Sequence, residues 1–156
     1  MCIRDRLPGT GFVLYDKSYE RPVFGMAKVP KQEVMRWSVR DNQIMMVEIL
    51  AVVQMIAAVG HNLRKKKLII FVDSQSAEGA LVKGGSSKED VSELVMVFWR
   101  LIQAFEILVY IDRVPTDSNI SDSCSRGSRD LAIRLGWTEL EIPESLDWAG
   151  GWLGPG

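Results

Sequence analysis

The sequence contains few of the residues that mark the commonest kinds of functional site. Two of its 156 residues are cysteine, Cys2 and Cys124, and one is histidine, His61. These numbers exclude a disulfide framework and a zinc site with the usual Cys and His spacing. A Gly-rich phosphate loop and a Ser-His-Asp pattern are also absent. With so little cysteine, we expect a reducing intracellular environment, either cytoplasm or nucleus.

Strong charge of one sign and a long uninterrupted apolar run are also absent. Lysine and arginine number 19, aspartate and glutamate 20, so the net charge is −1. Binding to a nucleic acid would therefore depend on a local surface. The apolar stretch 44–59 is short for a membrane span and contains Glu48, so we expect no membrane partner. The length, with 47% hydrophobic and 25% charged residues, fits one globular domain.

The two ends of the sequence differ from its middle. Residues 1–6, "MCIRDR", join poorly to the segment after them and look like translated remnants of sequencing adapters. We therefore interpret them as a non-native leader, with the native N-terminus missing and one domain over residues 7–136. Residues 137–156 are acidic and rich in glycine, proline and tryptophan, and we expect a tail with little structure.

Hydrophobic periodicity and turn residues predict eight elements between these ends. Residues 68–72 do not alternate with polar residues, which predicts a strand buried on both faces. Ser86 and Glu89 have the spacing of a capping box at a helix start. The predicted strands are 11–16, 21–30, 68–72 and 107–111, and the predicted helices are 43–59, 76–83, a segment following Glu89, and 128–136. The order β-β-α-β-α-α-β-α predicts an α/β fold with a mixed sheet flanked by helices.

Two carboxylates occupy positions where solvent contact is hard to arrange. Glu48 is the only charged residue between positions 43 and 59, and Asp73 directly follows the buried strand. Each has an ordinary explanation, a surface position for Glu48 and a helix N-cap for Asp73. A helix and the strand that follows it pack face to face, however, so Glu48 can point toward the sheet edge where Asp73 emerges. Two neighbouring carboxylates repel each other and favour a bound divalent cation.

A third acid is harder to choose from the residues alone. Asp122 lies in "SNISDSCSR" after the last strand, but Asp112 and Asp117 are of the same type and also near that strand's end. Spacing does not decide among the three. The basic run 64–67 precedes the buried strand and so lies roughly 20 Å from Asp73, at the opposite edge of the sheet. We interpret it as a solvated loop.

Four segments, in order, resemble the ribonuclease H (RNase H) domains of retroelement reverse transcriptases. The likeness covers about residues 9–136. "RVPTDSNISDSCSRG" is similar to the N-x-x-A-D-x-x-S-R signature that follows the fifth strand in these domains, and it is the most specific of the four. The others are "GTGFVLYD" with "RPVFGMAKVP" for strands two and three, "QIMMVEILAVVQMI" for the first helix, and "LIIFVDSQSAEGALVKG" for the fourth strand and its following helix.

The resemblance implies that Glu48, Asp73 and Asp122 are three of the family's four catalytic, metal-binding acids. The fourth belongs to strand one, which would precede Leu7 and is absent here; Asp16 does not match its place. A histidine frequent in the family is also missing, and Arg113 stands near its position.

The implied activity is hydrolysis of the RNA strand of an RNA–DNA hybrid with two Mg²⁺ or Mn²⁺ ions, in a protein with an upstream polymerase domain. Without the fourth acid, we expect little or no activity from these 156 residues alone. One alternative is a non-catalytic RNase H-like module with a structural, tethering or nucleic-acid-binding role. Another is a different nuclease on the same fold, such as an exonuclease or integrase core. Retention of three acids favours the RNase H enzyme, and the "SNISDSCSR" motif disfavours the other nucleases.

Overall fold

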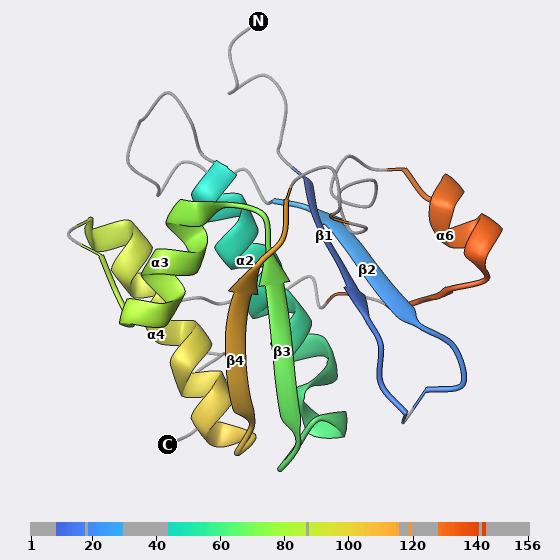
Figure 1. The fold of residues 1–156 in the computed structure, drawn as a ribbon, viewed down its shortest axis with the longest axis horizontal. Helices are drawn as coiled ribbons and strands as arrows, with labels where there is room; N and C mark the ends of the chain where they lie inside the picture. Colours follow the sequence, from blue (N-terminus) through green and yellow to red (C-terminus); the bar gives the residue numbers. More distant parts are fainter. Residues whose placement is uncertain are drawn as a thin grey trace, which may run out of the picture.

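A computed structural model describes residues 9–17, 19–29, 44–86, 88–115, 119, 128–140 and 142. Within these ranges the chain is an α/β protein with four α-helices and five strands (Figure 1). The elements are β1 (Gly9–Leu14), β2 (Val23–Lys28), α2 (Ile44–Val59), the short 3-10 helix η2 (Gly60–Asn62), β3 (Lys67–Val72), α3 (Gln75–Lys83), α4 (Glu89–Ala104), β4 (Leu108–Arg113), α6 (Asp130–Leu135) and β5 (Thr138–Glu139). The predicted order of helices and strands is confirmed, with η2 and β5 in addition.

The described strands form two sheets where the sequence predicts one. The first has the order β1-β2-β5, with β1 and β2 antiparallel and β5 parallel to β2, so it is a mixed sheet. The second consists of the parallel strands β3 and β4. Strands β1 and β2 are neighbours in the sequence and form a hairpin. Strands β3 and β4 are connected by α3 and α4. No described strand joins β1 to β3. In Figure 1, β1 and β3 are the edge strands by which the two sheets face each other.

Helix α2 is the centre of the core. It contacts β1, α3 and α4, and most of its buried residues belong to one hydrophobic cluster that includes side chains of both sheets. Fully buried residues on this helix include Ile49, Leu50, Val53 and Ile56. The sequence predicts that this stretch is short for a membrane span, but together with η2 the segment Met45–Asn62 has the length and composition of one, and 61% of it is buried inside the fold. A core helix of a folded domain has the same properties.

Strand β3 is buried on one face only, so the prediction that both faces are buried is wrong. Leu68, Ile70 and Val72 are buried in the shared cluster, whereas Ile69 and Phe71 are 58% and 59% exposed. The helices cover the first face, and none of the described elements covers the second. An apolar run does not reveal this difference, because both faces carry the same kind of residue.

Helix α3 has a local cap at each end, whereas α4 begins without a side-chain cap. The Ser74 hydroxyl accepts a hydrogen bond from the backbone N–H of Ala77 (3.2 Å) and N-caps α3, which ends at Gly84 in the left-handed conformation (φ 79°). Helix α4 begins at Glu89 without a side-chain cap, so the predicted capping box is not formed. Ser86 is bonded instead to Ser92, whose hydroxyl accepts from the Ser86 N–H (2.9 Å) and donates to the Ser86 carbonyl (2.6 Å).

The first residues after α6 are structured, unlike the prediction for the tail. Trp137 packs near Phe24 of β2, with ring centroids 6.4 Å apart. Thr138 and Glu139 then form β5 beside β2. Backbone pairing with β2 and the contact with Phe24, both distant in the sequence, hold this segment, which explains why its composition alone predicts little structure. Residues 143–156 lie outside the described part of the chain.

A buried polar pair joins α2 to β1. Thr10 and Gln54 are each 1% exposed, and the Thr10 hydroxyl donates to Gln54 Oε1 (2.5 Å). We expect Thr10→Val to lower the free energy of unfolding by about 1–3 kcal/mol, because it leaves the buried Gln54 carbonyl without this donor. Adding Gln54→Leu should restore most of the loss, since it removes both polar groups. Urea denaturation of both variants measures this, and a Thr10→Val protein as stable as the wild type would contradict it.

Candidate functional site

Glu48 extends from α2 to the carboxyl end of β3. Its Oε1 accepts a hydrogen bond from the backbone N–H of Asp73 (2.6 Å), and its Oε2 accepts one from the N–H of Ser74 (3.1 Å). Glu48 is the only charged residue of α2, and its side chain is half-buried. The prediction that Glu48 points toward the strand end where Asp73 emerges is therefore confirmed.

Asp73 follows Val72, the last residue of β3, and is not the cap of the next helix. Ser74 fills that position. The Asp73 carboxylate instead receives a hydrogen bond from the side-chain amide of Asn119, with 3.0 Å between Nδ2 and Oδ2. The ordinary explanation of Asp73 as a helix N-cap is thus excluded, and its carboxylate lies beside Glu48.

The pair has unusual electrostatics. Burial, followed by a side-chain hydrogen bond with Asp73 and the negative charge of Asp73, raises the pKa of Glu48 to about 7. The two backbone N–H groups that Glu48 accepts from oppose this rise, because they favour the charged carboxylate. At neutral pH without a cation, Glu48 therefore carries a proton for part of the time. A divalent cation can replace that proton and balance both carboxylates.

The other acids considered from the sequence do not join this pair within the described residues. The carboxylate of Asp16 pairs with Lys66 Nζ (3.0 Å), just before β3 begins. Asp112 is exposed on β4, where its Oδ1 accepts from the N–H of Arg113 (2.7 Å). Asp117 and Asp122 lie outside the described residues, so the prediction that Asp122 is a ligand stays a prediction. In the described ranges, histidine, cysteine, aspartate and glutamate side chains form no group of three that could hold a metal.

The basic run 64–67 lies at the start of β3 and has structural partners. Lys65 pairs with Glu106 (3.7 Å), Lys66 pairs with Asp16, and the Arg64 guanidinium lies 5.9 Å from the centre of the Phe105 ring. Through these contacts, residues 64–66 pack against the end of α4 and the β1–β2 hairpin. They agree with its predicted place at the edge opposite Asp73.

Sequence reasoning missed the role of Asn119. It named the motif "SNISDSCSR" for its aspartate, while the asparagine at the motif's second position is the residue that reaches Asp73. The available signal was the motif itself, in which asparagine stands three residues before Asp122. An amide that orients a carboxylate fixes it for binding a cation.

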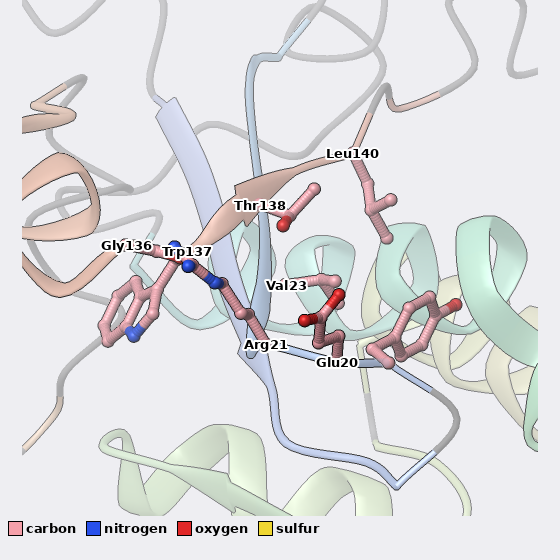
Figure 2. A pocket seen from close by; sticks show the side chains of 8 residues that line it. Glu20, Arg21, Val23, Gly136, Trp137, Thr138 and Leu140 are labelled. Carbon is pink, nitrogen blue, oxygen red and sulfur yellow. The ribbon is translucent and has the colours of Figure 1, made fainter.

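A second feature that sequence reasoning missed is a pocket between the end of the β1–β2 turn and β5. Its volume is about 530 Å³, and it is lined by Tyr19, Glu20, Arg21, Val23, Gly136, Trp137, Thr138 and Leu140. Figure 2 shows Arg21 extending toward Gly136, whose carbonyl accepts from Arg21 Nη1 at 3.5 Å. Neither Glu48 nor Asp73 lines this pocket. It forms because the segment after α6 packs back onto β2, and composition does not predict that packing.

The chemistry of the Glu48–Asp73 pair is that of an oxygen-ligand site. Two carboxylates from different elements lie together, one held by backbone N–H groups and the other by an amide. Hard divalent cations such as Mg²⁺ prefer ligands of this type. Comparison of the chain with models of protein families and with curated protein sequences finds no match.

Proposed function

We propose that this chain is an RNase H-type nuclease domain of a retroelement reverse transcriptase, acting on the RNA strand of RNA–DNA hybrids. The observation that carries the proposal is the placement of the Glu48 carboxylate beside Asp73 at the carboxyl end of a parallel strand. The family resemblance assigns these two residues to neighbouring catalytic acids. That they lie together supports the assignment, because acids that share a cation must lie within reach of one another.

The residues fit a divalent cation. Glu48 and Asp73 would hold it, with Asp122 as the predicted third ligand. A bound divalent cation supplies an activated water and stabilises the negative charge on the leaving 3′ oxygen. Burial is the main cause of the raised pKa of Glu48, and Asp73 adds to it; a bound cation would lower this pKa, because it favours the charged carboxylates.

The chain's own residues position these groups. The N–H groups of Asp73 and Ser74 hold both oxygens of Glu48, and Asn119 holds Oδ2 of Asp73. Fixed carboxylates lower the reorganisation needed when a cation and a phosphate arrive. The family senses its hybrid substrate through duplex shape and 2′-hydroxyl groups. A near-neutral net charge is compatible with such a local surface.

The finer fold assignment, the RNase H fold, is part of the proposal. It requires a strand between β1 and β3 that joins the two sheets and carries the fourth acid. Support comes from the pairing pattern, since β1 and β3 each have a described strand on one side only. An upstream polymerase domain, continuous with that strand, is the partner that the resemblance implies.

The test combines metal binding with cleavage. Mn²⁺ is titrated into the chain by calorimetry, and a labelled RNA–DNA hybrid is incubated with the chain and with a version extended by its native upstream residues. We expect Mn²⁺ binding in both, and metal-dependent cleavage of only the RNA strand in the extended version. Metal binding without cleavage in the extended version, or no metal binding at all, would favour a non-catalytic structural, tethering or nucleic-acid-binding module.

Asn119→Ala should weaken Mn²⁺ binding by about 10–100-fold, the usual effect of losing a group that orients a ligand. Its amide no longer fixes the Asp73 carboxylate, which then samples other orientations. Calorimetric titration measures the dissociation constant, and thermal unfolding checks the fold. Gln103→Ala, at an exposed position on α4, is the matched control and should bind Mn²⁺ as the wild type does. Equal affinity in both variants would show that Asn119 does not position Asp73.

A further inference from the structure

The sheet of β3 and β4 has one face that the described elements leave open. Alternate residues of each strand point to it, and we name it the β3–β4 face. Its large apolar members are 51–59% exposed: Ile69, Phe71, Leu108 and Tyr110. The pairing register places Ile69 directly opposite Tyr110, and Leu108 and Phe71 lie two residues along the strands in opposite directions from that pair. The four side chains are therefore contiguous.

Such a face is unusual for a parallel pair of strands. Parallel sheets occur almost only with both faces covered. Single exposed apolar side chains are ordinary, but contiguous ones mark a surface that binds another molecule. Here two aromatic and two aliphatic side chains gather on two neighbouring strands. The β3–β4 face therefore has the composition of the centre of an interface.

The charges on this face differ at its two ends. Lys67 lies opposite Leu108 where the strands begin, and Asp112 lies opposite Phe71 near their ends. Both are exposed. Four residues of strand separate these two levels, which is about 13 Å. Lys67 and Asp112 of one chain are thus too far apart to pair with each other, and the apolar residues lie between them.

We propose that the β3–β4 face binds a second copy of this chain. A twofold axis that lies in the interface plane, perpendicular to the strands, turns the second copy face to face and antiparallel to the first. Lys67 of each copy then lies at the same height along the strands as Asp112 of the other copy, displaced sideways by the distance between neighbouring strands. The apolar residues of the two copies meet at the centre. A surface with opposite charges at its two ends is self-complementary under this rotation, which is the requirement for a closed dimer.

The size of the face sets the expected strength of the dimer. Two strands offer less than the roughly 800 Å² per partner of a standard interface. Face-to-face sheets pack about 10 Å apart, close enough for the apolar side chains to interdigitate. We therefore expect a dimer that forms and dissociates with concentration, with a dissociation constant on the order of 10 µM.

The first experiment measures the oligomeric state of the full chain by sedimentation velocity, from about 1 to 300 µM, a range that brackets the expected constant. The wild type should shift from monomer to dimer. Tyr110→Lys places a charge at the centre of the β3–β4 face and should weaken the dimer at least about tenfold. Val82→Lys introduces the same charge at a 61% exposed position on α3 and should have no effect.

A charge exchange tests the orientation. Lys67→Glu sets two carboxylates against each other at both ends of the dimer and should weaken it, whereas Lys67→Glu combined with Asp112→Lys should restore it. A wild type that stays monomeric throughout the range would overturn the proposal and indicate that another molecule or another part of this chain covers the face. A dimer unaffected by Tyr110→Lys, or not restored by the double exchange, would overturn it as well.

Discussion

Asp73→Asn should lower the affinity of the chain for Mn²⁺ by at least about 100-fold, because it removes the negative charge of one of the three proposed ligands, Glu48, Asp73 and Asp122. Any metal-dependent cleavage of an RNA–DNA hybrid should fall by about a thousandfold or more. The fold should persist. Asparagine has the shape of aspartate, its carbonyl can still accept from Asn119, and its neutral side chain no longer repels Glu48.

Asp112→Asn is the matched control for this prediction. It makes the same chemical change at an exposed residue of β4 whose carboxylate accepts from the N–H of Arg113 and takes no part in the hydrogen bonds that join Glu48 to the end of β3. Titration of Mn²⁺ by calorimetry measures both variants of the chain, and single-turnover cleavage of a labelled hybrid measures the same substitutions in the version extended by its native upstream residues. Thermal unfolding monitors their stability. If Asp73→Asn kept the wild-type affinity and cleavage, Asp73 would not be a ligand, and the proposed nuclease site would be wrong.

The second large effect is a stability change in Glu48→Gln that depends on pH and metal. In the folded protein the pKa of Glu48 is about 7, above its ordinary value of 4.5. The folded state therefore binds the Glu48 proton more tightly than the unfolded state does. This contribution to stability is fully present below pH 4.5 and is lost as the pH rises through 7. Glutamine stays neutral, so it avoids that loss.

In metal-free buffer at pH 8, the free energy of unfolding of Glu48→Gln should exceed that of the wild type by about 1–2 kcal/mol. At pH 5 the difference between the two proteins should be smaller. The value at pH 8 is discounted for the solvent that reaches a half-buried carboxyl. Mg²⁺ should reverse the order at pH 8, because it stabilises the two carboxylates of the wild type and has one fewer ligand in the variant. Urea denaturation at both pH values measures the difference. Glu93→Gln, at an exposed position on α4, should show neither effect.

The Glu48–Asp73 pair could be predicted from the sequence because both residues break a local pattern. A lone acid inside an apolar helix and an acid directly after an apolar strand each require a partner. The helix-then-strand order also restricts where they can meet. The hydrogen bonds of Glu48 could not be predicted, since nothing in the sequence shows that its carboxylate accepts from the backbone N–H groups of Asp73 and Ser74.

Features that depend on which surfaces remain uncovered could not be predicted. The residues of β3 are apolar on both faces, and only the arrangement of the helices decides that Leu68 is buried and Phe71 exposed. The division into two sheets follows from the lack of a described strand between β1 and β3. Trp137 and β5 are ordered by contacts with β2, more than a hundred residues earlier.

Helix α2 also fixes how far one sheet is displaced along the helix axis relative to the other. It holds the end of β3 through Glu48 and holds β1 through Gln54, whose carbonyl accepts from Thr10. The two anchors are six residues apart, which is about 9 Å along the axis and about a third of a turn around it. They therefore emerge on different sides of the helix, one toward each sheet. Inserting a single residue between them would turn one anchor by about 100° away from its sheet. The apolar residues between Glu48 and Gln54 can be exchanged for others of similar size, but their number cannot change.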